Sequence, residues 1–181
     1  MTKGEIRQVE GMALRLGFKD FKWVQPRTII TGYWVRAKCQ FGCPSYGRKA
    51  CCPPELPSFS DCQRFFEEYK SSILFHFSLR LQKPGIRFAW GRRINKKMVD
   101  LEKEVFLSGF YKAFTFPANP CRICDQCKKS KQECLNPGIA RPTLEGFCVD
   151  VYATARKIGY PIQVLKGYKE EMNRFGLLLI E

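Results

Sequence analysis

The amino-acid sequence predicts an α+β or mixed α/β fold in a single compact domain, with a small sheet flanked by helices and two cysteine-rich loops. Apolar residues recur at helical spacing in some segments, while β-branched and aromatic residues are concentrated in others. These segments alternate without a regular βαβ order. The chain has 181 residues and is 45% hydrophobic, which is sufficient for one core within residues 1–181.

The N-terminal part is expected to form a helix, a strand and a loop. Helical spacing of apolar residues predicts a helix over 5–16, which Gly17 ends in a left-handed conformation. The run 28–36 is rich in β-branched and aromatic residues and predicts a strand that leads to Cys39. Prolines and glycines in 39–58 then predict a loop that carries the first cysteines.

The remaining elements alternate between helix and strand. Ser60 and Gln63 have the spacing of a capping box and predict the start of a second helix. The apolar run 72–79 predicts a buried strand. A third helix is predicted from the stripe Ile94, Met98, Leu101 and Val105, with Asp100, Glu102 and Glu104 on its solvent side. The last predicted elements are a helix with the stripe Leu144, Cys148, Val151, Ala155 and Ile158, ended by Gly159, and strands at 161–165 and 175–180.

Cysteine is the unusual component of the sequence. The chain has 10 cysteines, and its first residues, MTKGEIRQVE, lack the apolar core of a secretory signal peptide. We therefore expect a cytoplasmic protein with reduced thiols, and many thiols in a reducing compartment indicate metal binding or thiol chemistry. The longest apolar runs are too short to span a bilayer, so no membrane association is expected.

The strongest motif is a run of closely spaced cysteines in the second half of the chain. Cys121, Cys124 and Cys127 follow one another at intervals of three, and Cys134 comes seven residues later. This C-x2-C-x2-C-x6-C spacing resembles the ligand run of ferredoxins and predicts a [4Fe–4S] cluster. Zinc is the alternative, although zinc sites usually combine two separated cysteine pairs.

A second group of cysteines precedes this run. Cys39, Cys43 and either Cys51 or Cys52 can supply three sulfurs to a second cluster. Three cysteines leave one iron open to a small ligand, or the site borrows Cys134 or Cys62 as its fourth ligand. A loop that binds zinc, or one larger site formed by all these cysteines, remains open.

The other residues that carry chemistry give weaker signals. Cys62 lies near the start of a predicted helix, where it can reach the first loop or fill the core, and Cys148 lies on an apolar stripe, which favours a core position. The single histidine, His76, cannot be combined into a hydrolase triad, and no nucleotide-binding glycine motif occurs. Catalytic residues are therefore unknown.

The net charge of +14 points to an anionic partner. Residues 80–97 contain seven basic residues and no acid, and they include Phe88 and Trp90. Such a surface favours an acidic redox protein or an anionic ligand, because long-range attraction speeds the encounter. A nucleic acid is less favoured, because no known binding module accompanies the stretch. The oligomeric state is not indicated.

Several motifs together resemble a known family. They are Cys39-x3-Cys43-Pro-x-Tyr-Gly, Cys52-Pro-Pro, Gly109-Phe-Tyr-Lys-Ala113, Cys121-x2-Cys124-x2-Cys127, Cys134 and Ala140-Arg-Pro-Thr-Leu-Glu145. Over residues 33–181 the chain resembles the uncharacterised family of predicted metal-binding proteins from anaerobic bacteria and archaea. The resemblance implies seven ligands: Cys39, Cys43, Cys52, Cys121, Cys124, Cys127 and Cys134. Cys51 and Cys148 are not required by the family pattern, so Cys51 ranks below the seven, as does Cys62.

These observations lead to one principal hypothesis and two alternatives. The principal hypothesis is an iron–sulfur protein with one or two [4Fe–4S] clusters that acts in electron transfer or assists a redox or metallocofactor enzyme. One alternative is a zinc-stabilised module whose basic surface binds RNA or an acidic protein. The other is an enzyme that uses an open iron at the three-cysteine site.

Overall fold

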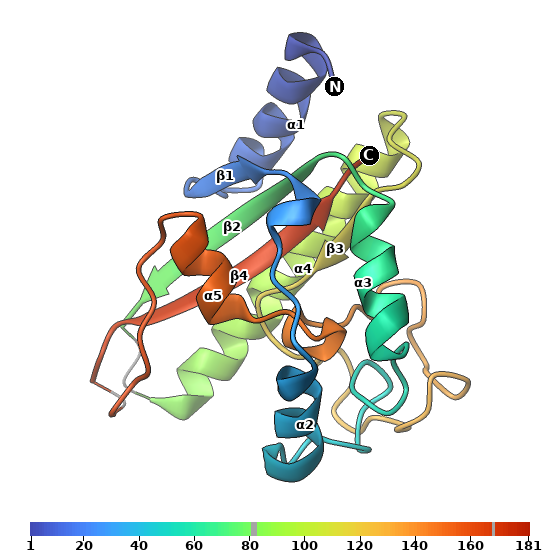
Figure 1. Cartoon of the computed structure of the whole chain (residues 1–181), viewed down its shortest axis with the longest axis vertical. Helices are drawn as coiled ribbons and strands as arrows, with labels where there is room; N and C mark the ends of the chain where they lie inside the picture. Colours follow the sequence, from blue (N-terminus) through green and yellow to red (C-terminus); the bar gives the residue numbers. More distant parts are fainter. Residues whose placement is uncertain (81–82, 168) are drawn as a thin grey trace.

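The fold is built on a four-stranded antiparallel sheet with the strand order β1-β2-β4-β3. The computed structural model describes residues 1–80, 83–167 and 169–181. The strands are β1 (Phe21–Val24), β2 (Ser72–Leu79), β3 (Phe114–Phe116) and β4 (Met172–Leu179). The two long strands β2 and β4 pair along their full length and form the centre of the sheet (Figure 1). The predicted α+β class is confirmed.

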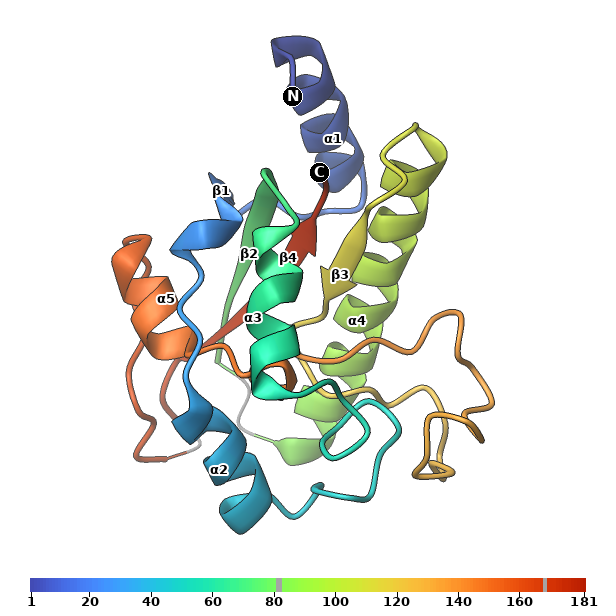
Figure 2. The same ribbon diagram turned by 45° about the vertical axis from the view of Figure 1, so that its right-hand side comes forward.

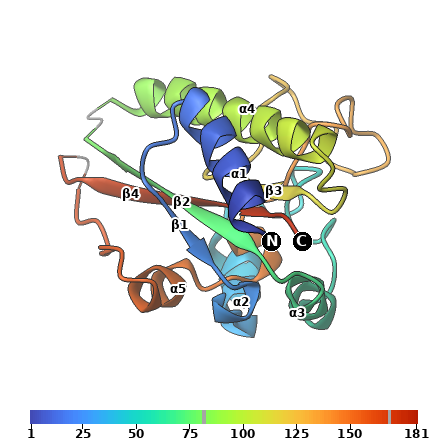
Figure 3. The ribbon, with the colours of Figure 1, turned by 90° about the horizontal axis from the view of Figure 1, so that it is seen from above.

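Helices cover both faces of the sheet, as the view from above shows (Figure 3). Two helices, α1 (Lys3–Arg15) and α4 (Pro84–Leu107), lie on one face. The other face carries α2 (Tyr33–Gly42), α3 (Phe59–Glu67) and α5 (Val151–Lys157). Two short 3-10 helices, η1 (Pro26–Thr28) and η2 (Glu145–Phe147), lie in the connecting segments.

Because both faces are covered, each central strand contributes to two cores. Successive side chains of a strand point to opposite faces. Leu74 of β2 therefore packs in the core under α3 and α5, whereas its neighbours Ile73 and Phe75 pack in the core under α1 and α4. Burial on both faces explains why β2 contains the continuous apolar run 73–75 and β4 the run 177–179, rather than alternating residues.

The packing of α4 on the sheet depends on a glycine in β4. A Cβ atom at Gly176 would lie 2.5 Å from the sulfur of the buried Met98 and 3.2 Å from the carbonyl oxygen of Phe116. Glycine at this position therefore lets α4 approach the strand closely. The stripe Met98, Leu101 and Val105 is buried here, so the helix predicted from these residues is confirmed.

The strand predicted over 28–36 is wrong, and Cys39 lies on a helix. This segment crosses the face of the sheet instead of joining its edge, and its one ladder contact among the described residues is the bridge from Thr31 to Val149 (Figure 1). The high β-propensity of such residues depends on a neighbouring strand. With no strand to pair with, the chain turns at Gly32 and continues as α2, which buries Val35.

The helix predicted along 144–158 is also wrong as one continuous element. Cys148 has a left-handed φ of 63°, which separates η2 from α5. The new helix begins where the side chain of Asp150 accepts a hydrogen bond from the amide of Ala153, at 2.9 Å. The segment 161–165 is not a strand, whereas the strand predicted at 175–180 is confirmed within β4.

Three local predictions need correction. Ser58, and not Ser60, caps α3, because its hydroxyl accepts a hydrogen bond from the amide of Asp61. Glu102 is buried rather than solvated, because the segment after β3 covers that side of α4. The basic residues of 80–97 lie mostly on helix α4, which begins at Pro84. Leu81 and Gln82 lie outside the described residues.

Candidate metal centre

The two cysteine-rich segments meet at one end of the sheet. One segment, 43–58, connects α2 to α3, and the other, 117–144, connects β3 to η2. Both lack regular strands or α-helices, because prolines and glycines interrupt them. Figures 1 and 2 both place these two loops side by side beyond the lower end of α3.

Five cysteines line one cavity between these loops. The cavity has a volume of about 180 Å³, and its cysteines are Cys51, Cys121, Cys124, Cys127 and Cys134. The run 121–134 thus contributes four thiols, and the first loop contributes the fifth. Cys51, which the sequence ranked below the seven expected ligands, faces this cavity and forms a thiol hydrogen bond with Cys121.

Hydrogen bonds hold the two loops around the cavity. The amide of Ala50 donates to the sulfur of Cys127 at 3.4 Å, and the side-chain amide of Asn136 donates to the sulfur of Cys124 at 3.0 Å. The ammonium group of Lys49 donates to the carbonyl oxygen of Cys121 at 3.0 Å. N–H groups directed at sulfur stabilise thiolates, which are the form that binds metal.

The electrostatics of the cavity favour a thiolate at Cys121. The hydrogen bond from the Cys51 thiol lowers the pKa of Cys121 to about 6, with smaller contributions from the amide of Ile123 and the charges of Lys49 and Lys131, although burial opposes the shift. Cys51 donates in this pair, so its own pKa is raised well above the ordinary value. At neutral pH one proton is therefore shared between two sulfurs.

Cys39, Cys43 and Cys52 form a neighbouring group. Cys39 and Cys43 lie one helical turn apart at the end of α2, where the amide of Cys43 donates to the carbonyl oxygen of Cys39. The pKa of Cys52 is raised to about 11, mainly by burial. The charge of Lys49 opposes this shift, and the negative charges of Cys43, Cys39 and Cys121 add to it. Cys52 therefore lies within electrostatic range of both groups of thiols.

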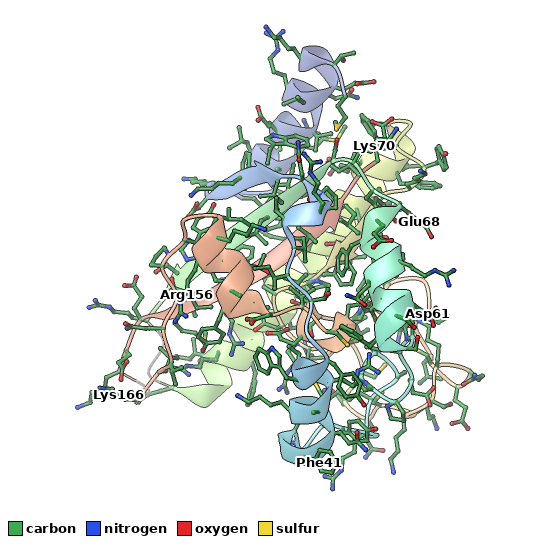
Figure 4. The ribbon with its side chains drawn as sticks, in the orientation of Figure 1. Phe41, Asp61, Glu68, Lys70, Arg156 and Lys166 are labelled. Carbon is green, nitrogen blue, oxygen red and sulfur yellow. The ribbon has the colours of Figure 1, made fainter. Side chains whose placement is uncertain are left out.

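Cys39 and Cys43 also border a broad groove. The groove has a volume of about 990 Å³ and extends from α2 to α5 and the end of β4. The helix α2 projects beyond the sheet, and Phe41 at its tip is 84% exposed (Figure 4). In this second group Cys43 is exposed, whereas Cys39 and Cys52 are half-buried.

The remaining two cysteines lie apart from both groups. Cys62 and Cys148 are fully buried in the core under α3, and their thiols hydrogen-bond to each other. The guanidinium of Arg36 lies 3.9 Å from the sulfur of Cys62 and also hydrogen-bonds to Cys148. The core position expected for Cys148 is confirmed, and neither thiol lines the two cavities.

The thiols lie near one another, but they are not arranged around a single metal ion. Among the described residues, no three cysteine, histidine or acidic side chains lie close enough together to hold a metal ion. The donor set facing the cavity of about 180 Å³ nevertheless consists of thiols, which are soft ligands suited to zinc and iron–sulfur clusters. Motif spacing did not indicate that Cys51 faces this cavity. The only sequence signal for it is the adjacent pair Cys51 and Cys52, because the side chains of adjacent residues in a turn point in different directions.

Comparison with known proteins agrees with this chemistry. Residues 22–180 match the model of the family described as "Predicted metal-binding protein (DUF2284)". No curated protein and no solved structure matches the chain. None of the described helices is long and apolar enough to cross a bilayer. The family match covers both cysteine loops and all of the sheet except Phe21, and the chain belongs to this family of predicted metal-binding proteins.

Proposed function

We propose that the chain is an iron–sulfur protein that holds a [4Fe–4S] cluster between its two cysteine loops. The observation that carries this proposal is the set of five thiols, from two distant segments, around one cavity of about 180 Å³. Four of the five, Cys121, Cys124, Cys127 and Cys134, have ferredoxin-like spacing. N–H groups of Ala50 and Asn136 are directed at two of the sulfurs, as the negative charge of a cluster requires.

The spacing of the thiols favours a cluster over a single zinc ion. Tetrahedral zinc with bonds of about 2.3 Å brings its four sulfurs to within about 3.8 Å of one another. Among the described residues, no three potential ligands are arranged to hold one metal ion. In a [4Fe–4S] cubane each thiolate binds a different iron, so the four thiolates surround the whole cluster and lie farther apart than around one ion. Thiols arranged around a cavity fit a cubane better than a single zinc ion.

Cys39, Cys43 and Cys52 are the proposed ligands of a second cluster. Eight cysteines, which is the number that two cubanes require, lie in the two adjoining groups when Cys51 is included. The first group has five thiols and the second has three, so the second needs one ligand from the first. We propose that Cys121 is the fourth ligand of the second cluster, because its charge acts on Cys52. Cys51, which hydrogen-bonds to Cys121, then takes its place as a ligand of the first cluster.

The proposed role is electron transfer, either directly or in support of a redox or metallocofactor enzyme. When bound, such clusters supply one-electron chemistry. Arg92, Arg93 and Lys96 are exposed on α4, and Arg92 and Lys96 border a cavity that reaches Cys121. An acidic redox protein is therefore the proposed partner, because opposite charge speeds its encounter with this side of the molecule.

Anaerobic purification tests the proposal. A brown protein with about four or eight irons per chain, and equal sulfide, is expected. Cys124→Ser should lose a cluster, whereas Cys62→Ser should keep the full iron content because Cys62 lies outside both cavities. A colourless protein with stoichiometric zinc would overturn the proposal.

A second candidate function is supported by the groove beside Cys39 and Cys43. If no fourth thiol reaches the second cluster, one iron faces the groove of about 990 Å³ and can take a small substrate. This enzyme reading predicts that added substrates change the EPR spectrum of the reduced protein. If the protein acts in electron transfer, the EPR spectrum of reduced Cys43→Ser should lose one signal. The EPR spectrum of the unmodified protein should not change when small molecules are added.

A further inference from the structure

A third cavity lies directly behind the cysteine run, against helix α4. Its volume is about 480 Å³, within the range typical of small-molecule sites. Helix α4 forms one side, and the segments around Cys121 and Arg141 form the other. The electron-transfer proposal uses Arg92 and Lys96 at the border of this cavity, but it assigns no ligand to the cavity itself.

The walls of this cavity are mostly apolar. Val99, Pro117, Ile123 and Ile139 contribute side chains to the lining. Ile123 and Ile139 are 37% and 47% exposed, so the cavity presents apolar surface to solvent. An apolar body of aromatic size that covered these side chains would remove their surface from water.

Positive charge surrounds the apolar walls. Four cationic side chains and one carboxylate line the cavity: Arg92, Lys96, Arg122, Arg141 and Asp100. Arg141 is committed to the buried Glu102, and Lys96 is committed to Asp100 at 2.8 Å. Arg92 pairs at 3.5 Å with Asp125, but the Asp125 side chain is 96% exposed, so this pair is weak.

Arg122 is the cation best placed to receive a ligand. Its guanidinium stacks on the ring of Phe88, 4.2 Å from the ring centroid, which fixes its position. Among the described residues, no carboxylate forms an ion pair with it. A guanidinium held in this way can form two parallel hydrogen bonds with a carboxylate or phosphate group.

We propose that this cavity binds a small organic anion, with an apolar body against Val99 and Ile139 and a carboxylate or phosphate group on Arg122. Cys121 and Ile123 line both this cavity and the five-thiol cavity, so the ligand would lie against the back of the metal loop. Binding at this site does not depend on which metal the thiols hold.

Fluorescence of anilinonaphthalene sulfonate, which combines an apolar body with one anionic group, tests the proposal on the metal-loaded protein. Arg122→Gln should weaken binding of this probe about tenfold, because it removes a charge-assisted hydrogen bond. Val99→Trp fills the cavity and should abolish binding. The matched control Arg64→Gln removes the same charge from α3, where the side chain is 76% exposed, and should leave binding unchanged.

Competition experiments define the ligand class. Naphthoate and naphthyl phosphate should displace the probe, and the stronger of the two identifies the preferred anion. Neutral naphthalenemethanol and inorganic phosphate should displace the probe at least about tenfold less well. The first lacks an anionic group for Arg122, and the second lacks an apolar body for the cavity walls. Equal weakening by Arg64→Gln and Arg122→Gln, or equal competition by naphthalenemethanol, would overturn the proposal. A Val99→Trp protein that melts normally and still binds the probe would do the same.

Discussion

At the scale of single residues, Cys51 and Cys52 show how one peptide bond separates two environments. Cys51 faces the cavity of the C-terminal run and hydrogen-bonds to Cys121. Cys52 is half-buried, and its pKa is raised mainly by this burial and further by the negative charges of Cys43 and Cys39. The prolines that follow restrict the backbone, so the two thiols cannot exchange roles freely. Each therefore belongs to a different group of thiols.

Substitution of each cysteine in turn should distinguish the two groups. Cys51→Ser and Cys52→Ser should each remove about half of the iron from a two-cluster protein, because each serves a different cubane. The EPR spectra of the two reduced variants should differ, since a different cluster survives in each. Identical residual spectra, or no iron loss in Cys51→Ser, would contradict this separation.

The buried pair Cys62 and Cys148 gives a prediction about thiol reactivity. The hydrogen bond from Cys62 and the nearby Arg36 lower the pKa of Cys148 to about 6, so a thiolate is present at neutral pH. Both side chains nevertheless have no exposed surface. Burial, and not protonation, should therefore protect the Cys148 thiolate from alkylation, and the buried Cys62 is protected as well.

Iodoacetamide followed by peptide mass spectrometry measures this protection. In the folded protein, both thiols should react at least about 1,000-fold more slowly than in denaturant, because modification requires an opening that costs several kcal/mol. The rate should track global stability in destabilised variants. Rapid labelling of Cys148 in the folded protein would show that the core opens locally.

At the scale of elements, the N-terminus of α3 tests which serine acts as the cap. The hydroxyl of Ser58 accepts from the amide of Asp61 at 3.2 Å and donates to its carboxylate at 2.6 Å. Ser58→Ala should lower the free energy of unfolding by about 1 kcal/mol. Ser60→Ala, the matched control, should change it by less than about 0.5 kcal/mol. Urea denaturation measures both, and a larger loss for Ser60→Ala would restore the cap predicted from sequence.

The sequence predicts those elements whose pattern is set by burial. The apolar runs of β2 and β4 and the helical stripe of α4 pack in the two cores, so their residues carry a clear signal. The segment 28–36 has strand-like composition but no neighbouring strand, so local propensity fails there. The short strands β1 and β3 form because they pair with the long strands β2 and β4. Their own residues give no signal of this pairing, so the sequence did not predict them.

The candidate site follows the same rule. Ligand spacing within the run Cys121–Cys134 is local and readable from the sequence. The approach of Cys51 to that run depends on how 43–58 folds against 117–144, so no spacing could indicate it. The helical position of Cys39 was missed because strand-like residues precede it.

The buried ion pair between Glu102 and Arg141 connects helix α4 to the second cysteine loop. Arg141 hydrogen-bonds to both carboxylate oxygens of Glu102 and to the carbonyl oxygens of Gly138 and Ala140. Glu102 also accepts from the amide of Thr115. The side chains are 17% and 9% exposed for Arg141 and Glu102, so solvent screens the pair only slightly. The pair therefore fixes the end of the loop that carries Cys134.

Removal of one partner should be costly. Glu102→Ala should lower the free energy of unfolding by about 3 kcal/mol, because it leaves the guanidinium buried without a counter-charge. The double variant Glu102→Ala with Arg141→Ala should lose less than the sum of the two single losses. Thermal and urea unfolding give the three values. Strict additivity would show that the two side chains do not stabilise the fold through each other.

At the scale of the whole molecule, the sheet and the thiol loops are stabilised by different means. The two cores join β2 and β4 to helices on both faces, and none of the eight thiols in the two cysteine groups belongs to either core. The loops 43–58 and 117–144 are held instead by a few hydrogen bonds, such as those from Lys49 to Cys121 and from Lys131 to Glu55. Bound metal would supply the additional connections between the loops.

Removal of the metal should therefore loosen one end of the molecule and leave the sheet folded. After treatment with a chelator and oxidant, trypsin should cleave at Lys128, Lys129 and Lys131 about tenfold faster, because these exposed lysines lie between the proposed ligands Cys127 and Cys134. The far-UV circular dichroism should change little, since the helices and β2–β4 pairing are packed in the two cores. Mass spectrometry of early fragments identifies the cleaved bonds. Simultaneous cleavage at Arg174, within β4, would instead mean that the sheet depends on the metal and that the whole chain unfolds as one unit.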